Sequence, residues 1–147
     1  MNNVNLEVQE GEFVAVMGPS GCGKSTFLHI TGMLDNPTDG EYFFMGEEVS
    51  RYPEKKRANL RKGNIGFVFQ QYNLIPVLTA RENVEFIMLL QKKPVHEMRE
   101  RALHLLEEVG LKDKANVRPS ELSGGQQQKL AIARVFLKAP KILIMDE

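Results

Sequence analysis

A glycine-rich stretch near the N-terminus ends in a lysine and two hydroxyl residues. It runs Gly18-Pro19-Ser20-Gly21-Cys22-Gly23-Lys24-Ser25 and matches the pattern G-x-x-x-x-G-K-[ST]. Glycines let backbone N–H groups wrap closely around phosphate oxygens, and a helix that starts after the loop adds its own unsatisfied donors. Lys24 can reach the β- and γ-phosphates of a nucleotide, and the Ser25 hydroxyl is suited to bind Mg²⁺. A plain glycine-rich turn is disfavoured, because a buried-strand pattern precedes the loop and a helical pattern follows it.

The cysteine and the histidines of the chain do not suggest a reactive or metal-binding cluster. Cys22 is the only cysteine, which excludes an intrachain disulfide and indicates a reducing compartment. It occupies a variable position of the loop pattern, so we interpret it as a small filler residue rather than a reactive thiol. His29, His96 and His104 lie in helical stretches without metal-ligand spacing, and we interpret them as structural or surface residues.

Two acidic residues follow an apolar run at the end of the sequence. Residues 142–145 predict a buried strand, and Asp146 and Glu147 come directly after it. In an open α/β sheet, the carboxyl ends of the strands face the ligand crevice. There Asp146 would bind Mg²⁺ directly or through water, and Glu147 is a candidate general base for an attacking water. Many strands end in an acid, so this interpretation depends on the phosphate loop in the same chain.

A second glycine pair stands at the expected start of another helix. The sequence is Leu122-Ser123-Gly124-Gly125-Gln126. The simplest interpretation is a serine N-cap followed by two flexible glycines. The functional interpretation is a second helix N-terminus that faces phosphate. A chain with two such ends favours a dimer, in which each phosphate loop is closed by the second end of the partner.

The elements that must position these residues alternate between strands and helices. Residues 4–8, 13–17 and 65–69 have strand patterns, and residues 41–49 predict a small hairpin. Helices are expected from 24 to about 34, from a Thr79–Glu82 capping box to about 91, along an apolar stripe at 98–109 that ends before Gly110, and from Ser123 to about 138. This alternation predicts an α/β fold with a mainly parallel core sheet.

The overall composition excludes several classes of protein. The 147 residues are 42% hydrophobic, and 19 basic residues balance 19 acidic ones, which argues against a protein that coats nucleic acid. No apolar run approaches the roughly 20 residues of a membrane helix, and no signal peptide is visible, so a membrane role requires a partner. The basic segment 51–62 is interpreted as a solvated helix or loop, with a partner-docking patch as the alternative.

Taken in order, these motifs resemble those of ABC transporter ATPase domains. The loop extended to Thr26 resembles Walker A, Gln70 after Phe67-Val68-Phe69 resembles the Q-loop, residues 122–126 resemble the signature motif, and residues 142–147 resemble Walker B. The resemblance covers essentially the whole chain. Residues 65–76 and 118–128 are similar to the lipoprotein-release and macrolide-export branch.

The resemblance implies a P-loop NTPase core with a small antiparallel β subdomain and a helical subdomain. The core would comprise residues 1–35, 60–70 and 139–147, with the hairpin at about 40–50 and the helical subdomain at about 71–138. ATP would lie between residues 18–26 of one chain and 123–126 of a second, head-to-tail copy. Lys24, Gln70 and Glu147 would be catalytic, and Ser25, Gln70 and Asp146 would hold Mg²⁺.

The same resemblance places the chain at the cytoplasmic face of the cell membrane, bound through a membrane-spanning subunit or domain. The loop 72–78 would face that subunit, and no nucleic acid partner is expected. ATP binding would close the pair of ATPase domains and hydrolysis would open it, which would move the attached membrane helices.

Three parts of the family pattern have no counterpart in the sequence. No aromatic residue that could stack on adenine precedes Phe13, and a D-loop and a switch histidine would follow Glu147. The sequence is therefore interpreted as a truncated domain, and the 147-residue chain alone is expected to bind ATP weakly, to hydrolyse it poorly and to aggregate. The alternatives are a non-catalytic truncated ATP-binding module, or a soluble ABC ATPase associated with translation or DNA. The DNA-associated alternative is disfavoured because no coiled-coil insertion separates Gly18 from Leu122.

Overall fold

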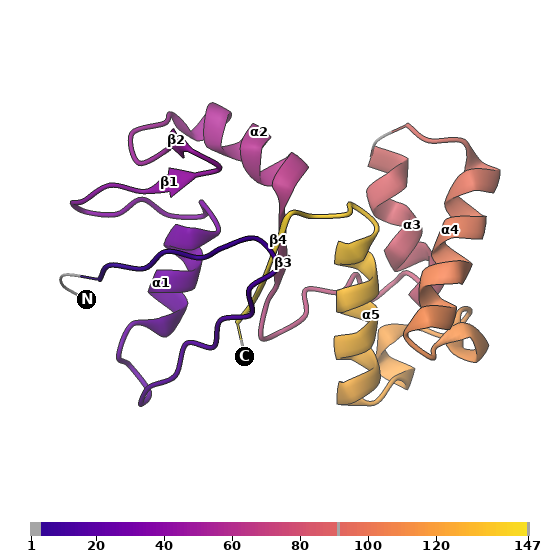
Figure 1. Ribbon diagram of the computed structural model, residues 1–147. Coiled ribbons are helices and arrows are strands. Elements are labelled where there is room, and N and C mark those ends of the chain that lie inside the picture. The colour runs from indigo at the N-terminus through magenta and orange to yellow at the C-terminus, as the bar shows by residue number, and fades with distance from the viewer. Residues whose placement is uncertain (1–3, 91, 147) are drawn as a thin grey trace. The chain divides into compact units, whose positions relative to one another are not determined.

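The chain divides into two compact units. The structure, a computed structural model, describes residues 4–90 and 92–146. One unit is Met1–Arg57 and the other is Ala58–Glu147. Figure 1 shows their helices and strands. Within the two described ranges, no helix is long and apolar enough to cross a lipid bilayer.

The first unit holds one complete helix and a short hairpin. Its elements are α1 (Lys24–Thr31), β1 (Phe43–Phe44) and β2 (Glu47–Glu48). The two strands pair antiparallel, which confirms the hairpin predicted for residues 41–49. The turn between them is formed by Met45 and Gly46, which have φ angles of 52° and 82°, as the tight turns of hairpins require.

Tyr42 connects the hairpin to α1. Its hydroxyl donates a 2.7 Å hydrogen bond to the carbonyl oxygen of Thr31, the last residue of the helix. Burial raises the pKa of the Tyr42 phenol to about 12, so this donor keeps its proton throughout the neutral range. The helix is shorter than the predicted 24–34, because Met33 adopts a left-handed φ of 56° and ends the helical path.

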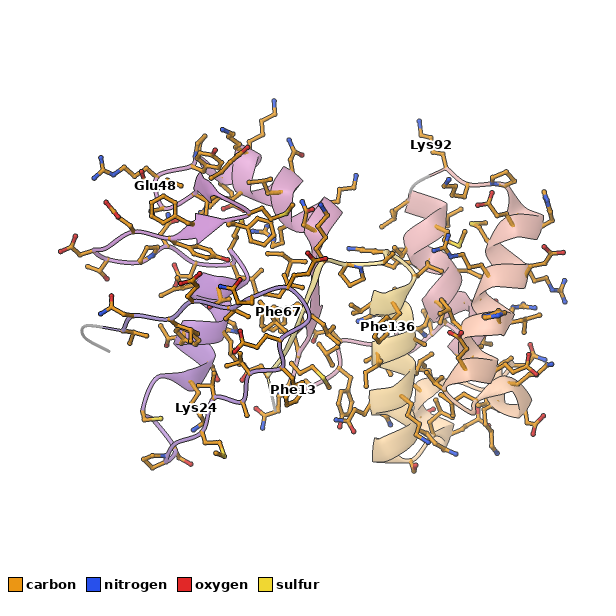
Figure 2. The ribbon with its side chains drawn as sticks, in the orientation of Figure 1. Phe13, Lys24, Glu48, Phe67, Lys92 and Phe136 are labelled. Atoms are coloured by element: carbon orange, nitrogen blue, oxygen red, sulfur yellow. The ribbon has the colours of Figure 1, made fainter. Side chains whose placement is uncertain are left out.

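Two strands predicted at the N-terminal end are wrong. Residues 4–8 and 13–17 have irregular backbone, and Phe13 and Met17 are 93% and 89% exposed (Figure 2). An apolar run forms a strand only where a neighbouring strand accepts its backbone hydrogen bonds. Among the described residues, the two ladders are β1–β2 and the pair described next, and neither contains residues 4–17.

The second unit contains a parallel strand pair. β3 (Ile65–Val68) and β4 (Ile142–Met145) pair in register, with Ile65 opposite Ile142 and Val68 opposite Met145. Both strands were predicted, and their parallel pairing confirms the predicted direction of the core sheet. The ladder continues past β4, where the Asp146 N–H donates a 3.0 Å hydrogen bond to the Val68 carbonyl.

Three helices pack side by side in this unit (Figure 1). They are α3 (Ala80–Leu90), α4 (Val95–Glu108) and α5 (Gly124–Phe136), with short 3₁₀ turns η1 (Lys112–Lys114) and η2 (Pro119–Glu121) between the last two. Their shared core includes Val84, Met88, Ala102, Leu106 and Leu130, each at most 1% exposed. The predicted stripe on α4 faces this core, and Gly110 ends the helix region with a φ of 72°. At the other end of the α3–α4 hairpin, Lys92 extends into solvent (Figure 2).

Local capping signals were predicted correctly. The Thr79 N–H donates to Glu82 Oε2 at 2.8 Å, and the Glu82 N–H donates to Thr79 Oγ1 at 3.3 Å. The hydrogen bonds from Thr79 lower the pKa of the Glu82 carboxyl. The predicted end of α3 near Gln91 lies outside the described residues, and α5 ends at Phe136 rather than near Lys138.

Glycine at position 66 allows α5 to pack directly on β3. A Cβ atom there would collide with Val135 Cγ1 and would lie 3.0 Å from Pro140 Cγ. Val68 on the same strand forms a buried cluster with Ala131 and Val135. The helix that begins at Ser123 is thus seated against the strand that leads to Gln70.

The basic segment 51–62 forms most of a helix, α2 (Glu54–Asn64), which begins in the first unit and ends in the second. Lys55 and Lys62 are exposed, as a solvated helix predicts. Arg57 is an exception, because it is only 9% exposed, pairs with Glu54 and donates to Asn36 Oδ1. The docking alternative remains a prediction.

Candidate functional site

The loop before α1 has backbone features that require its glycines. Gly21 and Gly23 have φ angles of 79° and 96°, in the left-handed region where a Cβ atom is strained. At Gly18 a Cβ atom would lie 2.7 Å from Cys22 Sγ, so the exposed Cys22 side chain would have to move. Cys22 is an exposed free thiol whose sulfur occupies the space beside Gly18. The glycines at 21 and 23 therefore allow the left-handed backbone of the loop, and the glycine at 18 leaves space for the Cys22 side chain.

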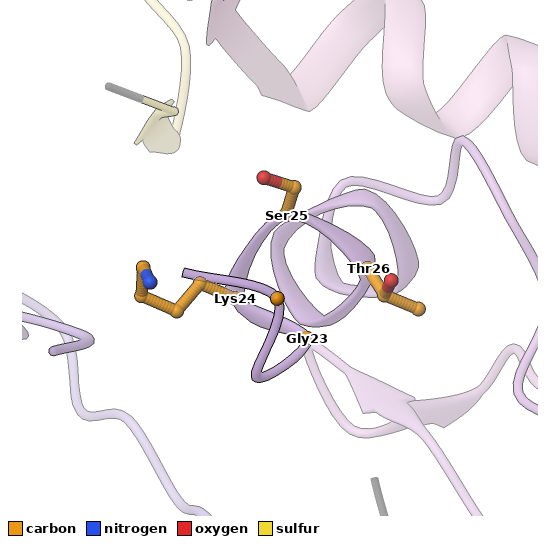
Figure 3. Close-up of a pocket in the computed structure, with 5 residues that line it drawn as sticks. Gly23, Lys24, Ser25 and Thr26 are labelled. Carbon is orange, nitrogen blue, oxygen red and sulfur yellow. The ribbon is translucent and has the colours of Figure 1, made fainter. Parts of the chain in front are cut away.

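The N-terminus of α1 has no side-chain cap. Gly23 is the N-cap residue and provides no side-chain hydrogen bond, and the first turn contains no acidic residue. The partial positive charge of this helix end is therefore not offset by a carboxylate in the turn. A cavity of about 220 Å³ lies here, lined by Gly21, Gly23, Lys24, Ser25 and Thr26 (Figure 3). It is smaller than a typical pocket for a whole ligand, and its lining of a helix N-terminus, an ammonium group and hydroxyls suits the phosphates of a nucleotide.

Lys24 folds back over the loop. Its Nζ donates hydrogen bonds of 2.7 Å to the Gly18 carbonyl and 2.9 Å to the Pro19 carbonyl, and it lies 3.7 Å from Cys22 Sγ. These acceptors carry no net charge. Phosphate oxygens are stronger acceptors for an ammonium group, because both partners are then charged. The side chain is thus held over the loop, ready to exchange neutral acceptors for anionic ones.

The hydroxyls of Ser25 and Thr26 extend from the first turn of α1 in different directions (Figure 3). A serine hydroxyl is a suitable oxygen ligand for Mg²⁺. The structure shows no group of three or more His, Cys, Asp or Glu residues in its described ranges that could hold a metal ion. A single serine hydroxyl fits Mg²⁺ bound to a nucleotide, because that ion keeps several waters and phosphate oxygens and needs few protein ligands.

Gln70 and Asp146 lie at the same edge of the parallel strand pair. Gln70 follows β3 and Asp146 follows β4, and the two strands end in register at Val68 and Met145. Gln70 is exposed, whereas Asp146 is half-buried. This is the carboxyl edge at which ligands bind in open α/β sheets. Glu147, the predicted general base, lies outside the described residues.

The N-terminus of α5 is held by a reciprocal capping box. The Gln126 N–H donates to Ser123 Oγ at 3.3 Å, and the Ser123 N–H donates to Gln126 Oε1 at 2.9 Å. Gly124 and Gly125 are exposed at the start of the helix. The predicted serine N-cap is confirmed, and the backbone donors of the two glycines stay accessible beside it.

Three polar residues that shape these loops were missed at the sequence level. Gln127 Nε2 donates to the carbonyls of Pro119 and Leu122, which holds the chain before Ser123. Asn83 and Arg134 each bond several backbone groups of the segment after Gln70. Their partners are backbone atoms, which every residue type has, so the sequence does not identify the partners. The sequence does show an asparagine and an arginine among the apolar residues of a helix, which is unusual enough to suggest a specific role.

The family model of the ABC transporter matches residues 1–147. The chain belongs to this family. Its members include the ATP-binding protein MJ1508 of Methanocaldococcus jannaschii, which is 52% identical over all of this chain and 66% of its own length. The lipoprotein-releasing system ATP-binding protein LolD of Aquifex aeolicus is 50% identical, again over all of this chain and 66% of its own length. The macrolide export ATP-binding/permease protein MacB of Brucella abortus is 48% identical over all of this chain and 23% of its own length.

A solved structure extends the comparison to the fold. The ATP-binding cassette MJ0796, a dimer bound to ADP and Pi, superposes with a TM-score of 0.90 at 47% identity, covering 99% of this chain and 64% of the cassette. The predicted α/β P-loop NTPase fold and the resemblance to the lipoprotein-release and macrolide-export branch are therefore confirmed. By its sequence, the chain belongs to the ATP-binding domains of ABC transporters. It spans about two thirds of the length of the ATP-binding proteins it matches.

Proposed function

We propose that the full-length protein that contains this chain binds and hydrolyses ATP to power a membrane transporter, and that it does so as a head-to-tail pair of copies. The uncapped N-terminus of α1, with Lys24 folded over the loop beside it, is the observation that carries the proposal. This arrangement supplies backbone donors, a helix end and a cation at one place, which is what a triphosphate requires.

In this proposal the residues of the phosphate loop bind and orient the triphosphate. Backbone N–H groups of residues 18–26 donate to its oxygens. Lys24 leaves the Gly18 and Pro19 carbonyls and pairs with the β- and γ-phosphates instead. The exchange favours binding because charge-assisted hydrogen bonds replace neutral ones.

The residues proposed to hold Mg²⁺ are Ser25, Gln70 and Asp146. The ion, when bound, neutralises the charge that develops on the phosphate oxygens during transfer. Glu147 is proposed to take the proton of the attacking water, because a carboxylate within hydrogen-bond reach of that water can act as a general base. Gln70 is proposed to orient the same water.

A second copy is proposed to complete the site with residues 123–126. Ser123, Gly124 and Gly125 are exposed at the start of α5, so their donors are accessible to a phosphate presented by another chain. The dimeric structure of MJ0796 supports the pairing of two copies. The contacts of the γ-phosphate would stabilise only the closed pair, so hydrolysis would release it.

The transporter role assigns a position and a partner to the chain. We place it at the cytoplasmic face of the cell membrane, held by a membrane-spanning subunit that contacts the loop 72–78. The names of LolD and MacB support this role. The division into a core of residues 1–35, 60–70 and 139–147, a hairpin at about 40–50 and a helical subdomain at about 71–138 belongs to the same proposal.

The substitution Ser123→Asp tests the shared site. Aspartate is as good an N-cap as serine, so α5 should keep its capping geometry. The added carboxylate would stand where the partner's phosphate is proposed to bind, and a like-charge pair at about 4 Å costs roughly 4 kcal/mol at an effective dielectric constant of about 20. We expect MgATP-dependent dimerisation, measured by light scattering in a Glu147→Gln background in which the closed pair accumulates, to weaken at least about 100-fold.

Ser120→Asp is the matched control, because Ser120 is an exposed residue of η2 and receives the same charge. In the same Glu147→Gln background it should dimerise with MgATP as the protein without the Ser120 substitution does. If Ser123→Asp dimerised as tightly as this control, residues 123–126 would not face a phosphate of the second copy.

A further inference from the structure

The loop after Gln70 contains two consecutive residues in an unfavourable backbone conformation. Tyr72 and Asn73 have φ angles of 58° and 48°, and neither is glycine. A residue with a Cβ atom loses roughly 1–2 kcal/mol in this left-handed region, and asparagine tolerates it better than tyrosine does. Such a turn persists only when surrounding groups hold it in place.

Arg134 of α5 holds this turn. Its Nη1 donates a 2.7 Å hydrogen bond to the Asn73 carbonyl, and its Nη2 donates a 2.9 Å hydrogen bond to the Tyr72 carbonyl. The planar guanidinium thus binds both strained residues at once. A lysine could not reproduce this two-pronged contact, because its ammonium group lacks the fixed spacing of the two nitrogens.

The contact uses a charged group where a neutral one would be less costly. Burial lowers the pKa of the Arg134 guanidinium, and in the described ranges no carboxylate forms an ion pair with it. Arg134 is half-buried, so its charge is removed in part from water without a counter-charge, which is unfavourable. The two carbonyl contacts therefore indicate that an arginine is used here because its planar guanidinium group matches the positions of both carbonyl groups.

Arg134 connects two segments that contain residues of the proposed nucleotide site. Gln70 lies two residues before Tyr72, and α5 begins at the Ser123–Gln126 capping box, about 16 Å along the helix from Arg134 at 1.5 Å per residue. The same helix packs on β3, which leads directly into Gln70. We propose that Arg134 is a positioning residue that fixes Gln70 relative to the N-terminus of α5. This inference rests on the proposed function.

The rest of the loop is anchored independently. Asn83 is fully buried, accepts a hydrogen bond from the Ile75 N–H, and donates to the carbonyls of Ile75, Leu78 and Thr79. Arg134 therefore controls the part of the loop next to Gln70, whereas Asn83 controls the part next to α3. Loss of Arg134 should release Gln70 without unfolding the whole segment.

Steady-state ATP hydrolysis by the full-length protein tests the inference. We expect Arg134→Met to lower kcat about 10-fold or more and to change KM for MgATP less than about 3-fold, because the phosphate loop is untouched. Arg134→Lys, which keeps the charge and can reach one carbonyl, should lose several-fold in kcat. If Arg134→Met does not fold, the same split between kcat and KM in Arg134→Lys decides the question. Unchanged kcat in the variants that fold would overturn the proposal.

A double-mutant cycle separates positioning from a general effect on the fold. If Arg134 acts through Gln70, Arg134→Met should reduce kcat little further in a Gln70→Ala background. An equal fold-reduction in both backgrounds would refute the inference. Arg101→Met is the matched control, because Arg101 also reaches a backbone carbonyl of the α5 region, that of Leu137 at 3.2 Å, and should leave kcat unchanged.

The proposed function is judged separately in the same assay. Wild-type protein should hydrolyse MgATP, and Lys24→Ala should not. A wild-type protein without saturable hydrolysis would refute the proposed function, whereas normal hydrolysis with a silent Arg134→Met would refute only the positioning role.

Discussion

In the full-length protein, Lys24→Ala should weaken the affinity for MgATP about 100-fold. The Lys24 ammonium group is held over the loop by the Gly18 and Pro19 carbonyls, 2.7 and 2.9 Å away, beside the uncapped end of α1. Charge-assisted hydrogen bonds contribute about 1.5–3 kcal/mol each, and 1.4 kcal/mol corresponds to a tenfold change in Kd. Calorimetric titration with MgATP measures the loss of affinity.

Lys55→Ala provides the control for this substitution. Lys55 is an exposed residue of α2, so its removal changes the net charge equally without touching the loop. It should bind MgATP as the wild-type protein does. Equal affinities for Lys24→Ala and Lys55→Ala would mean that the cavity at the start of α1 is not the nucleotide site.

Glu147→Gln should bind MgATP normally and reduce kcat at least 100-fold. General base catalysis contributes typically about 10²- to 10⁴-fold, and an uncharged amide cannot take the proton of the attacking water. Because the γ-phosphate is then not cleaved, the closed pair of chains should accumulate. Single-turnover hydrolysis measures the first effect, and light scattering in MgATP measures the second.

This prediction rests on the place of Glu147 after β4 and Asp146 in the sequence. Glu100→Gln on the exposed surface of α4 is the control and should leave both measurements unchanged. Hydrolysis by Glu147→Gln at the wild-type rate would show that another group takes the proton.

Features that depend on neighbouring residues in the chain could be predicted from the sequence. The capping boxes at Thr79 and Ser123 each join residues three positions apart, so their geometry follows from local spacing. The glycines at 21 and 23 signalled left-handed backbone for the same reason. The apolar runs of β3 and β4 were also sufficient, because each strand finds the other as its partner.

Features that depend on residues far apart in the chain could not be predicted from the sequence. The strands expected at 4–8 and 13–17 failed because no ladder among the described residues includes them. Arg134 was missed because its acceptors are carbonyls of residues more than sixty positions away, and every residue type has a carbonyl. Arg57 was assigned to a solvated face, although Asn36 and Glu54 draw it into the interior.

The central claim is that each nucleotide site is shared between two copies of the chain. Mixing equal amounts of Lys24→Ala and Ser123→Asp protein, each also carrying Glu147→Gln so that the closed pair accumulates, tests it most directly. In a head-to-tail pair of the two variants, one site has both defects and the other has an intact loop and an intact signature segment. We expect the mixture to regain MgATP-dependent dimerisation, with one ATP held per two chains, at concentrations at which neither variant dimerises alone. A mixture that stays monomeric would contradict it.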